Sequence, residues 1–150
     1  AEMAAFYKAR GMSLYEGLQE LYEKYGYALE DISSFVLEGK EGLEKINKIM
    51  EELRVTKPVS FNGSDVVAVR DYMTSERYEI ATGKRQTLKL PRSNVLYYEM
   101  KDGAWFCIRP SGTEPKIKIY FGVLSDSGSD VADQLKKLQN NVLSVIKSML

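Results

Sequence analysis

Histidine is absent from this chain of 150 residues, and cysteine occurs only once. The missing imidazole excludes Ser-His-Asp and Cys-His catalysis, together with any metal site that needs a histidine ligand. The single Cys107 cannot form an internal disulfide, and its apolar strand pattern predicts a small core residue rather than a nucleophile. The chain also does not open with the basic residues and apolar stretch of a secretory leader. We therefore expect it in the reducing cytoplasm.

An excess of either charge is also lacking, since Lys plus Arg and Asp plus Glu both number 21. A net charge of zero provides no general attraction to nucleic acid or to a membrane surface. The longest apolar runs fall far short of the ~20 residues that cross a bilayer. We therefore expect neither a nucleic acid nor a membrane as a partner.

The hydrophobic share of 44% is sufficient for one well-buried domain, with at most a remnant of another. Residues 1–30 are predicted to be a helical remnant. The opening AEMAAFYKAR is helical in composition but has no capping residue, which indicates an element that begins upstream and a fragment of a longer protein. Ser13 and Glu16 have the spacing of a capping box for a second helix, which Gly26 ends.

Residues 31–150 are predicted to form a separate α+β domain. A strand or an extended connector over residues 32–37 precedes an amphipathic helix around 43–53, and the apolar period changes to two from Asp65 onward. A last amphipathic helix begins at Val131. This order predicts an antiparallel sheet of about four to five strands, with two helices on one face and the other face free.

The strongest hairpin signal is VLYYEMKDGAWFCIR, residues 95–109. Asp102 and Gly103 are predicted to form a tight type I′ turn between its two strands. Strand alternation leaves open whether Phe106 and Ile108 face the core, or Trp105 and Cys107 do. That choice decides the direction of the arginine that ends the hairpin.

The segment RPSGTEPK, residues 109–116, joins two strand patterns and has the composition of a phosphate-binding loop. Arg109 offers a planar fork of donors that suits two oxygens of one phosphate. Ser111 and Thr113 add hydroxyl donors, and Gly112 lets the backbone turn so that successive N–H groups point into one concavity. Two prolines bracket the loop and reduce the entropy lost on binding.

A purely structural interpretation of the same segment also stands. Gly, Pro, Ser and Thr are ordinary turn residues, and Arg109 is equally suited to being solvated or paired with Glu114. Composition alone does not decide between a phosphate site and a decorated loop. A further alternative is a stacking or docking platform on the strands that carry Trp105 and several tyrosines.

The stretch RPSGTEPKIKIYF closely resembles the C-terminal phosphate-binding loop of the α-D-phosphohexomutases, the phosphoglucomutase and phosphomannomutase family. The preceding LPRSNVLYYEMKDGAWFCI also resembles that family's hairpin. Residues 1–30 resemble the last helices of its third domain, and residues 31–150 its fourth, a TBP-like β-α-β(4)-α fold. KIKIY is more similar to the phosphoglucomutase and phosphomannomutase branch than to the phosphoglucosamine branch.

The resemblance implies that Arg109, Ser111, Gly112 and Thr113 contact the substrate phosphate, with Lys118 as a further contributor. It implies a parent isomerase of carbohydrate metabolism, an intramolecular phosphotransferase that interconverts hexose 1-phosphate and 6-phosphate. The implied reaction passes through a phosphoserine, with hexose 1,6-bisphosphate as intermediate and activator and with Mg²⁺ as metal. The implied partners are the phosphosugar and the missing N-terminal domains of the same enzyme.

The family's other motifs do not occur in this sequence. The nucleophilic serine in its Ser-His-Asn-Pro context, the aspartate-rich magnesium loop and the Glu-rich sugar-selecting loop all belong to earlier domains. We therefore expect no catalytic residue and no metal ligand here, and no activity from the chain alone. The rival hypothesis is a stand-alone anion-binding or protein-interaction module.

Overall fold

The structure is a computed structural model that describes residues 1–37, 39–112 and 114–149. Its strands form an eight-stranded antiparallel sheet in the order β1-β8-β7-β6-β3-β4-β5, with β2 paired to β3. The α+β class and the antiparallel sheet are confirmed; the sheet exceeds the expected strand number because the short β2, β4 and β5 extend it. The elements are α1 (Glu2–Ala9), α2 (Leu14–Tyr25), β1 (Tyr27–Val36), α3 (Gly39–Thr56), β2 (Ser60–Phe61), β3 (Ser64–Asp71), β4 (Glu76–Glu79), β5 (Arg85–Thr87), β6 (Leu96–Met100), β7 (Trp105–Pro110), β8 (Lys116–Ser125) and α4 (Val131–Met149).

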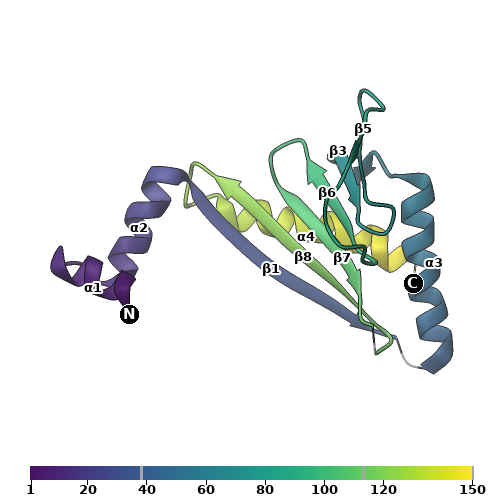
Figure 1. Cartoon of the computed structure of the whole chain (residues 1–150), viewed down its shortest axis with the longest axis horizontal. Helices are drawn as coiled ribbons and strands as arrows, with labels where there is room; N and C mark the ends of the chain where they lie inside the picture. The colour runs from purple at the N-terminus through teal and green to yellow at the C-terminus, as the bar shows by residue number, and fades with distance from the viewer. Residues whose placement is uncertain (38, 113, 150) are drawn as a thin grey trace.

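Helices α3 and α4 cover one face of the sheet, and α4 runs behind β8 and β1 in Figure 1. Alternate strand residues point toward them because side chains along a strand alternate between faces. Phe106 and Ile108 are fully buried on this face, which resolves the alternative left open by the sequence. Phe106 stacks on Tyr98 with ring centroids 4.6 Å apart. Among the described residues, no helix is long and apolar enough to span a membrane.

Helices α1 and α2 extend beyond the end of the long β1 and β8 pair, away from the rest of the sheet (Figure 1). The predicted capping box is confirmed: Ser13 caps α2, and Glu16 accepts a hydrogen bond from the Ser13 amide at 2.7 Å. Gly26 ends α2 as predicted. The two helices expose seven large apolar side chains: Met3, Phe6, Leu14, Tyr15, Leu18, Leu21 and Tyr25.

Two local predictions differ from the structure. The strand predicted for residues 32–37 begins earlier, since β1 spans Tyr27–Val36 and pairs along its whole length with β8. The predicted type I′ turn is wrong, because Gly103 takes a positive φ of 83° whereas Asp102 does not. Instead, the Met100 amide donates to the Ala104 carbonyl at 2.9 Å across a three-residue loop. Such a loop needs only one left-handed residue, its last.

A buried ion pair ties the end of α3 to the end of β3. Arg54 Nε lies 2.9 Å from Asp71 Oδ2, and the Arg54 and Asp71 side chains are only 16% and 11% exposed. Arg54 also donates to Asn94 Oδ1 at 2.9 Å, and Asp71 accepts from the Met73 amide at 2.9 Å. Two charges are tolerated in a protein interior when further hydrogen bonds help to offset the cost of removing them from water. Both Arg54 and Asp71 have such hydrogen bonds.

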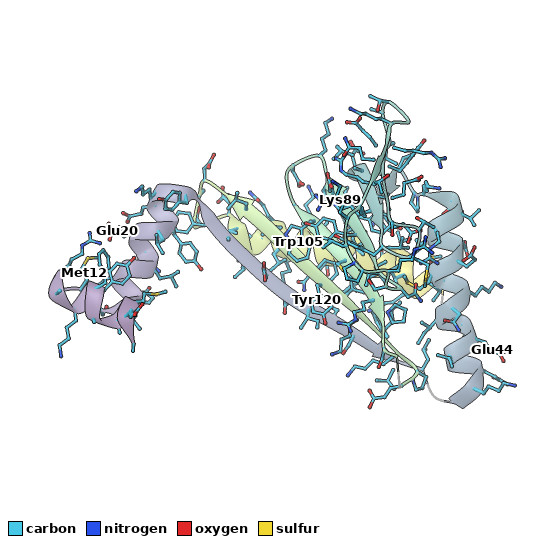
Figure 2. The ribbon with its side chains drawn as sticks, viewed as in Figure 1. Met12, Glu20, Glu44, Lys89, Trp105 and Tyr120 are labelled. Carbon is cyan, nitrogen blue, oxygen red and sulfur yellow. The ribbon has the colours of Figure 1, made fainter. Side chains whose placement is uncertain are left out.

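The face of the sheet opposite the helices carries a mixed polar and aromatic surface. Arg77 forms a two-point ion pair with Glu99: its Nε donates to Oε1 at 2.9 Å and its Nη2 donates to Oε2 at 2.6 Å. Hydrogen bonds from Arg77, and to a smaller extent from Arg70, hold the pKa of the Glu99 carboxyl below its usual range. Trp105 stacks on Tyr97, with centroids 5.3 Å apart. Figure 2 labels Trp105 on β7 and Tyr120 on β8, on strands that are neighbours in this sheet.

Candidate functional site

The loop after residue 109 connects β7 to β8, two paired strands in the middle of the sheet. Arg109 is the penultimate residue of β7 and stands opposite Lys118 in the ladder. The Ser111 amide donates to the Lys116 carbonyl at 2.7 Å, and the Lys116 amide donates to the Glu114 carbonyl at 2.7 Å. These two short hydrogen bonds hold the two ends of the loop together. They thereby fix the position of the backbone at Arg109, where the loop begins.

Arg109 and Lys118 point away from the helices. Their strand neighbours Ile108, Ile117 and Ile119 are fully buried, and successive residues of a strand alternate between faces. Arg109 is exposed and Lys118 half-buried. Register places Lys118 between Arg109 on one side and the exposed Ser34 of β1 on the other. Two cationic side chains therefore lie next to one another on the free face.

No ion pair within the described part of the chain joins Arg109, Lys116 or Lys118 to a carboxylate. The described residues therefore do not form the ion pair between Arg109 and Glu114 that the structural interpretation of the loop allowed. The guanidinium fork is left available for an external anion, and a phosphate is one anion that it can bind with two parallel hydrogen bonds, as it can a carboxylate.

The middle of the loop differs from the expectation in one respect. Gly112 does not take a left-handed φ, so a special backbone conformation is not what requires glycine there. Space is the more relevant property: a Cβ at Gly112 would meet no atom within 4 Å, and the residue is exposed. A ligand can therefore approach its backbone closely. Ser111 is half-buried at the start of the loop, and Thr113 lies outside the described residues.

The start of α3 and the loop line a common cavity, an arrangement that the sequence pattern did not predict. Gly39, Lys40 and Leu43 line a cavity of about 390 Å³ together with Gly112, Glu114 and Pro115. The N-terminal end of a helix carries a partial positive charge from its unpaired amides. The helix end thus adds positive potential beside a loop that begins at Arg109 and ends at Lys116. Helical spacing locates α3 in the chain but gives no information on which loop it touches.

Cys107 does not lie in the core, contrary to the prediction. It is half-buried on the free face, because Phe106 and Ile108 take the inward positions of β7. Burial raises the pKa of the Cys107 thiol to about 11, and the nearby Arg109 lowers it only in part. The thiol is therefore almost entirely protonated at neutral pH, which is unsuited to a nucleophile.

The arrangement can bind an anion but has little means of transforming it. A guanidinium, two ammonium groups and an open glycine backbone are donors that stabilise negative charge. Among the described residues, no three His, Cys, Asp or Glu side chains come together in a way that could hold a metal ion. The site is therefore suited to gripping and orienting a phosphorylated ligand whose reacting end lies elsewhere.

Comparison with known families gives a match over residues 35–138, to the family described as phosphoglucomutase/phosphomannomutase, C-terminal domain. Two curated relatives are both phosphoglucomutases. The protein from Staphylococcus aureus (strain bovine RF122 / ET3-1) is 36% identical over 131 residues, and that from Staphylococcus saprophyticus is 33% identical over 126. The aligned part is 87% of this chain and 24% of the S. aureus protein, so the chain spans about a quarter of that relative's length.

A solved structure also shares the fold. It is the open form of the exocytosis-sensitive phosphoprotein parafusin from Paramecium, which its description identifies as a phosphoglucomutase. The TM-score is 0.54 at 14% sequence identity, over 89% of this chain and 22% of the other. At this identity the likeness concerns the fold alone.

Proposed function

Because this chain belongs to the phosphoglucomutase/phosphomannomutase family and matches its C-terminal domain, we propose that it binds the substrate phosphate of a phosphohexomutase. The observation that carries the proposal is an exposed Arg109 that faces Lys118 and forms no ion pair with a described carboxylate. Arg109, Ser111, Gly112 and Thr113 would contact the phosphate, and Lys118 would contribute charge. The phosphate held here is the one that is not being transferred.

Positioning is the main contribution of such a site to catalysis. Phosphoryl transfer depends largely on holding the reacting oxygens in line, so a clamp on the distant phosphate orients the sugar toward the reacting centre. In the proposed parent reaction, hexose 1-phosphate and 6-phosphate interconvert through a phosphoserine and a bisphosphosugar. That intermediate has to be held by either end, so the clamp should recognise phosphate and ignore which carbon bears it.

The remaining parts of the reaction are assigned to other regions of a longer protein. Family members are generally metal-dependent, but the described residues contain no cluster suited to Mg²⁺, and no step is attributed to a metal in this chain. We propose that the helices within residues 1–30 complete a preceding domain, and that the phosphate-binding domain, expected to begin at residue 31, begins with β1 at Tyr27. On this proposal the chain alone is inactive, and its partners are the phosphosugar and the preceding domains.

Titration of the ¹⁵N-labelled chain with three sugars tests the proposed function. Glucose 1-phosphate and glucose 6-phosphate should bind with dissociation constants that agree within about threefold, a difference under ~0.7 kcal/mol. Unphosphorylated glucose should not shift the same amide signals, because the proposed contacts are to phosphate. Signals from Arg109 to Lys118 should move most.

Binding of glucose as strong as that of its phosphates would contradict the proposal. Shifts centred on Trp105 and Tyr97, with none at Ser111 or Gly112, would favour the interaction-module hypothesis instead.

A further inference from the structure

Leu37 links the phosphate loop to the start of α3. This residue follows β1 directly, and its amide donates to the Pro115 carbonyl at 2.8 Å. The hydrogen bonds between Ser111, Glu114 and Lys116 run within the loop, whereas this one joins the loop to a different part of the chain. It continues the β1 and β8 ladder one step beyond the pair of Val36 and Lys116.

Gly42 lies in the first turns of α3 and packs against the backbone of Leu37. A Cβ at Gly42 would overlap the Leu37 carbonyl oxygen and would lie 2.6 Å from its carbonyl carbon and 2.8 Å from its Cβ. Real Cβ atoms do not approach other heavy atoms this closely, and two of the three atoms belong to the backbone. A side-chain rotation therefore cannot relieve the overlap. Gly42 is buried in the structure, so the space is already fully used.

Of the two segments in contact, α3 is the more firmly held. Its side chains Ile46, Ile49, Met50 and Leu53 are at most 2% exposed and belong to the central core. Close-packed interiors resist displacement of a whole helix. A larger residue at position 42 would therefore move Leu37 rather than α3, and the Leu37 amide would lose its alignment with the Pro115 carbonyl.

We propose that Gly42 is a positioning residue for the phosphate loop, acting through the Leu37 amide on Pro115. The inference rests on the proposed function of that loop, and it adds a residue that is 73 positions away in sequence from Pro115 but 5 from Leu37. The loop amides and the Arg109 fork grip a phosphate only at a defined separation. An error of about 1 Å in placing a binding group can reduce a rate by roughly a hundredfold, so a smaller shift has a measurable effect.

Gly42→Ala tests the proposal in the full 150-residue chain. Hydrogen exchange at the Leu37 amide should accelerate by about tenfold, because opening of that hydrogen bond becomes easier by roughly 1.4 kcal/mol. The dissociation constant for glucose 6-phosphate should rise by about five- to tenfold. Both quantities are measured by NMR on the same sample.

Gly17→Ala is the matched control, since it also introduces a methyl group into a crowded helical position. Its Cβ would lie 2.5 Å from the Tyr7 ring, in the α1 and α2 pair rather than near the loop. This variant should keep the wild-type exchange rate at Leu37 and the wild-type affinity for glucose 6-phosphate. Wild-type values of both in Gly42→Ala would overturn the proposal.

The wild-type chain supplies a second measurement if Gly42→Ala fails to fold. On this proposal, bound glucose 6-phosphate and the hydrogen bond from the Leu37 amide to Pro115 both favour the same geometry of the loop. Saturation with glucose 6-phosphate should therefore slow hydrogen exchange at the Leu37 amide. Unchanged exchange in the saturated wild-type chain would overturn the inference. Absence of any glucose 6-phosphate binding to the wild-type chain would instead overturn the proposed function. In that case, exchange at Leu37 in a folded Gly42→Ala variant still decides whether Gly42 sets the link to Pro115.

Discussion

Arg109→Lys is expected to weaken the binding of glucose 6-phosphate by about ten- to a hundredfold, which corresponds to ~1.4–2.7 kcal/mol. The substitution keeps the positive charge but replaces a planar fork by a single ammonium, which cannot make two parallel hydrogen bonds to one phosphate. Isothermal calorimetry or NMR titration gives the dissociation constant. Glucose 1-phosphate should lose affinity by the same factor, because the proposed contact is to the phosphate alone.

Arg92→Lys provides the matched control for this prediction. Arg92 is exposed in the segment between β5 and β6, outside the loop from Arg109 to Lys116. The control substitution makes the same chemical change and should leave both dissociation constants at their wild-type values. Equal affinities for the wild-type chain and Arg109→Lys would remove Arg109 from the proposed site.

Asp71→Ala should be among the most destabilising substitutions in the chain. Asp71 is 8% exposed, and its removal leaves the Arg54 guanidinium with one fewer acceptor in a buried position. Breaking a buried ion pair from one side typically costs about 3–5 kcal/mol, because the remaining charge stays desolvated. The Arg54 guanidinium would keep only the exposed Glu51 carboxylate as an anionic partner, 3.4 Å away. Chemical denaturation of the variant measures the loss in the free energy of unfolding.

Asp65→Ala is the control for the stability prediction, since it removes the same side chain from the same strand β3. Its partner Lys101 is 3.9 Å away, and both side chains are more than half exposed. Exposed pairs contribute little, so we expect a change under about 1 kcal/mol. The double variant Arg54→Met with Asp71→Leu should recover most of the lost stability, because it leaves no unpaired charge. Equal losses for Asp71→Ala and Asp65→Ala would contradict a role for burial.

Local sequence signals predicted the elements whose cause is itself local. The apolar stripe after Val131 and the capping box at Ser13 depend on residues three or four apart, and both helices formed as expected. The alternation around the hairpin predicted two strands but could not assign their faces. That assignment depends on which face α3 and α4 cover, a property of the whole sheet, and Cys107 was placed on the wrong face for this reason.

The candidate site was predictable as a segment but not as a surface. The composition of residues 109–116 marked a candidate phosphate-binding loop but did not exclude an ordinary turn, and the family match covers the residues in which that loop lies. The facing pair of Arg109 and Lys118 follows from strand register, which the sequence constrains only through periodicity. The contact of Leu37 with Pro115 joins residues 78 positions apart, and no short-range pattern marks such a pair.

A crystal structure of the chain with glucose 6-phosphate tests the central claim most directly. The account predicts phosphate oxygens within about 3 Å of the Arg109 guanidinium and of backbone amides in the loop, on the face of the sheet opposite α3 and α4. It also predicts that Arg109 remains free of protein carboxylates in the complex. A phosphate bound elsewhere, with Arg109 folded onto Glu114 and the loop closed over the space beside Gly112, would contradict it.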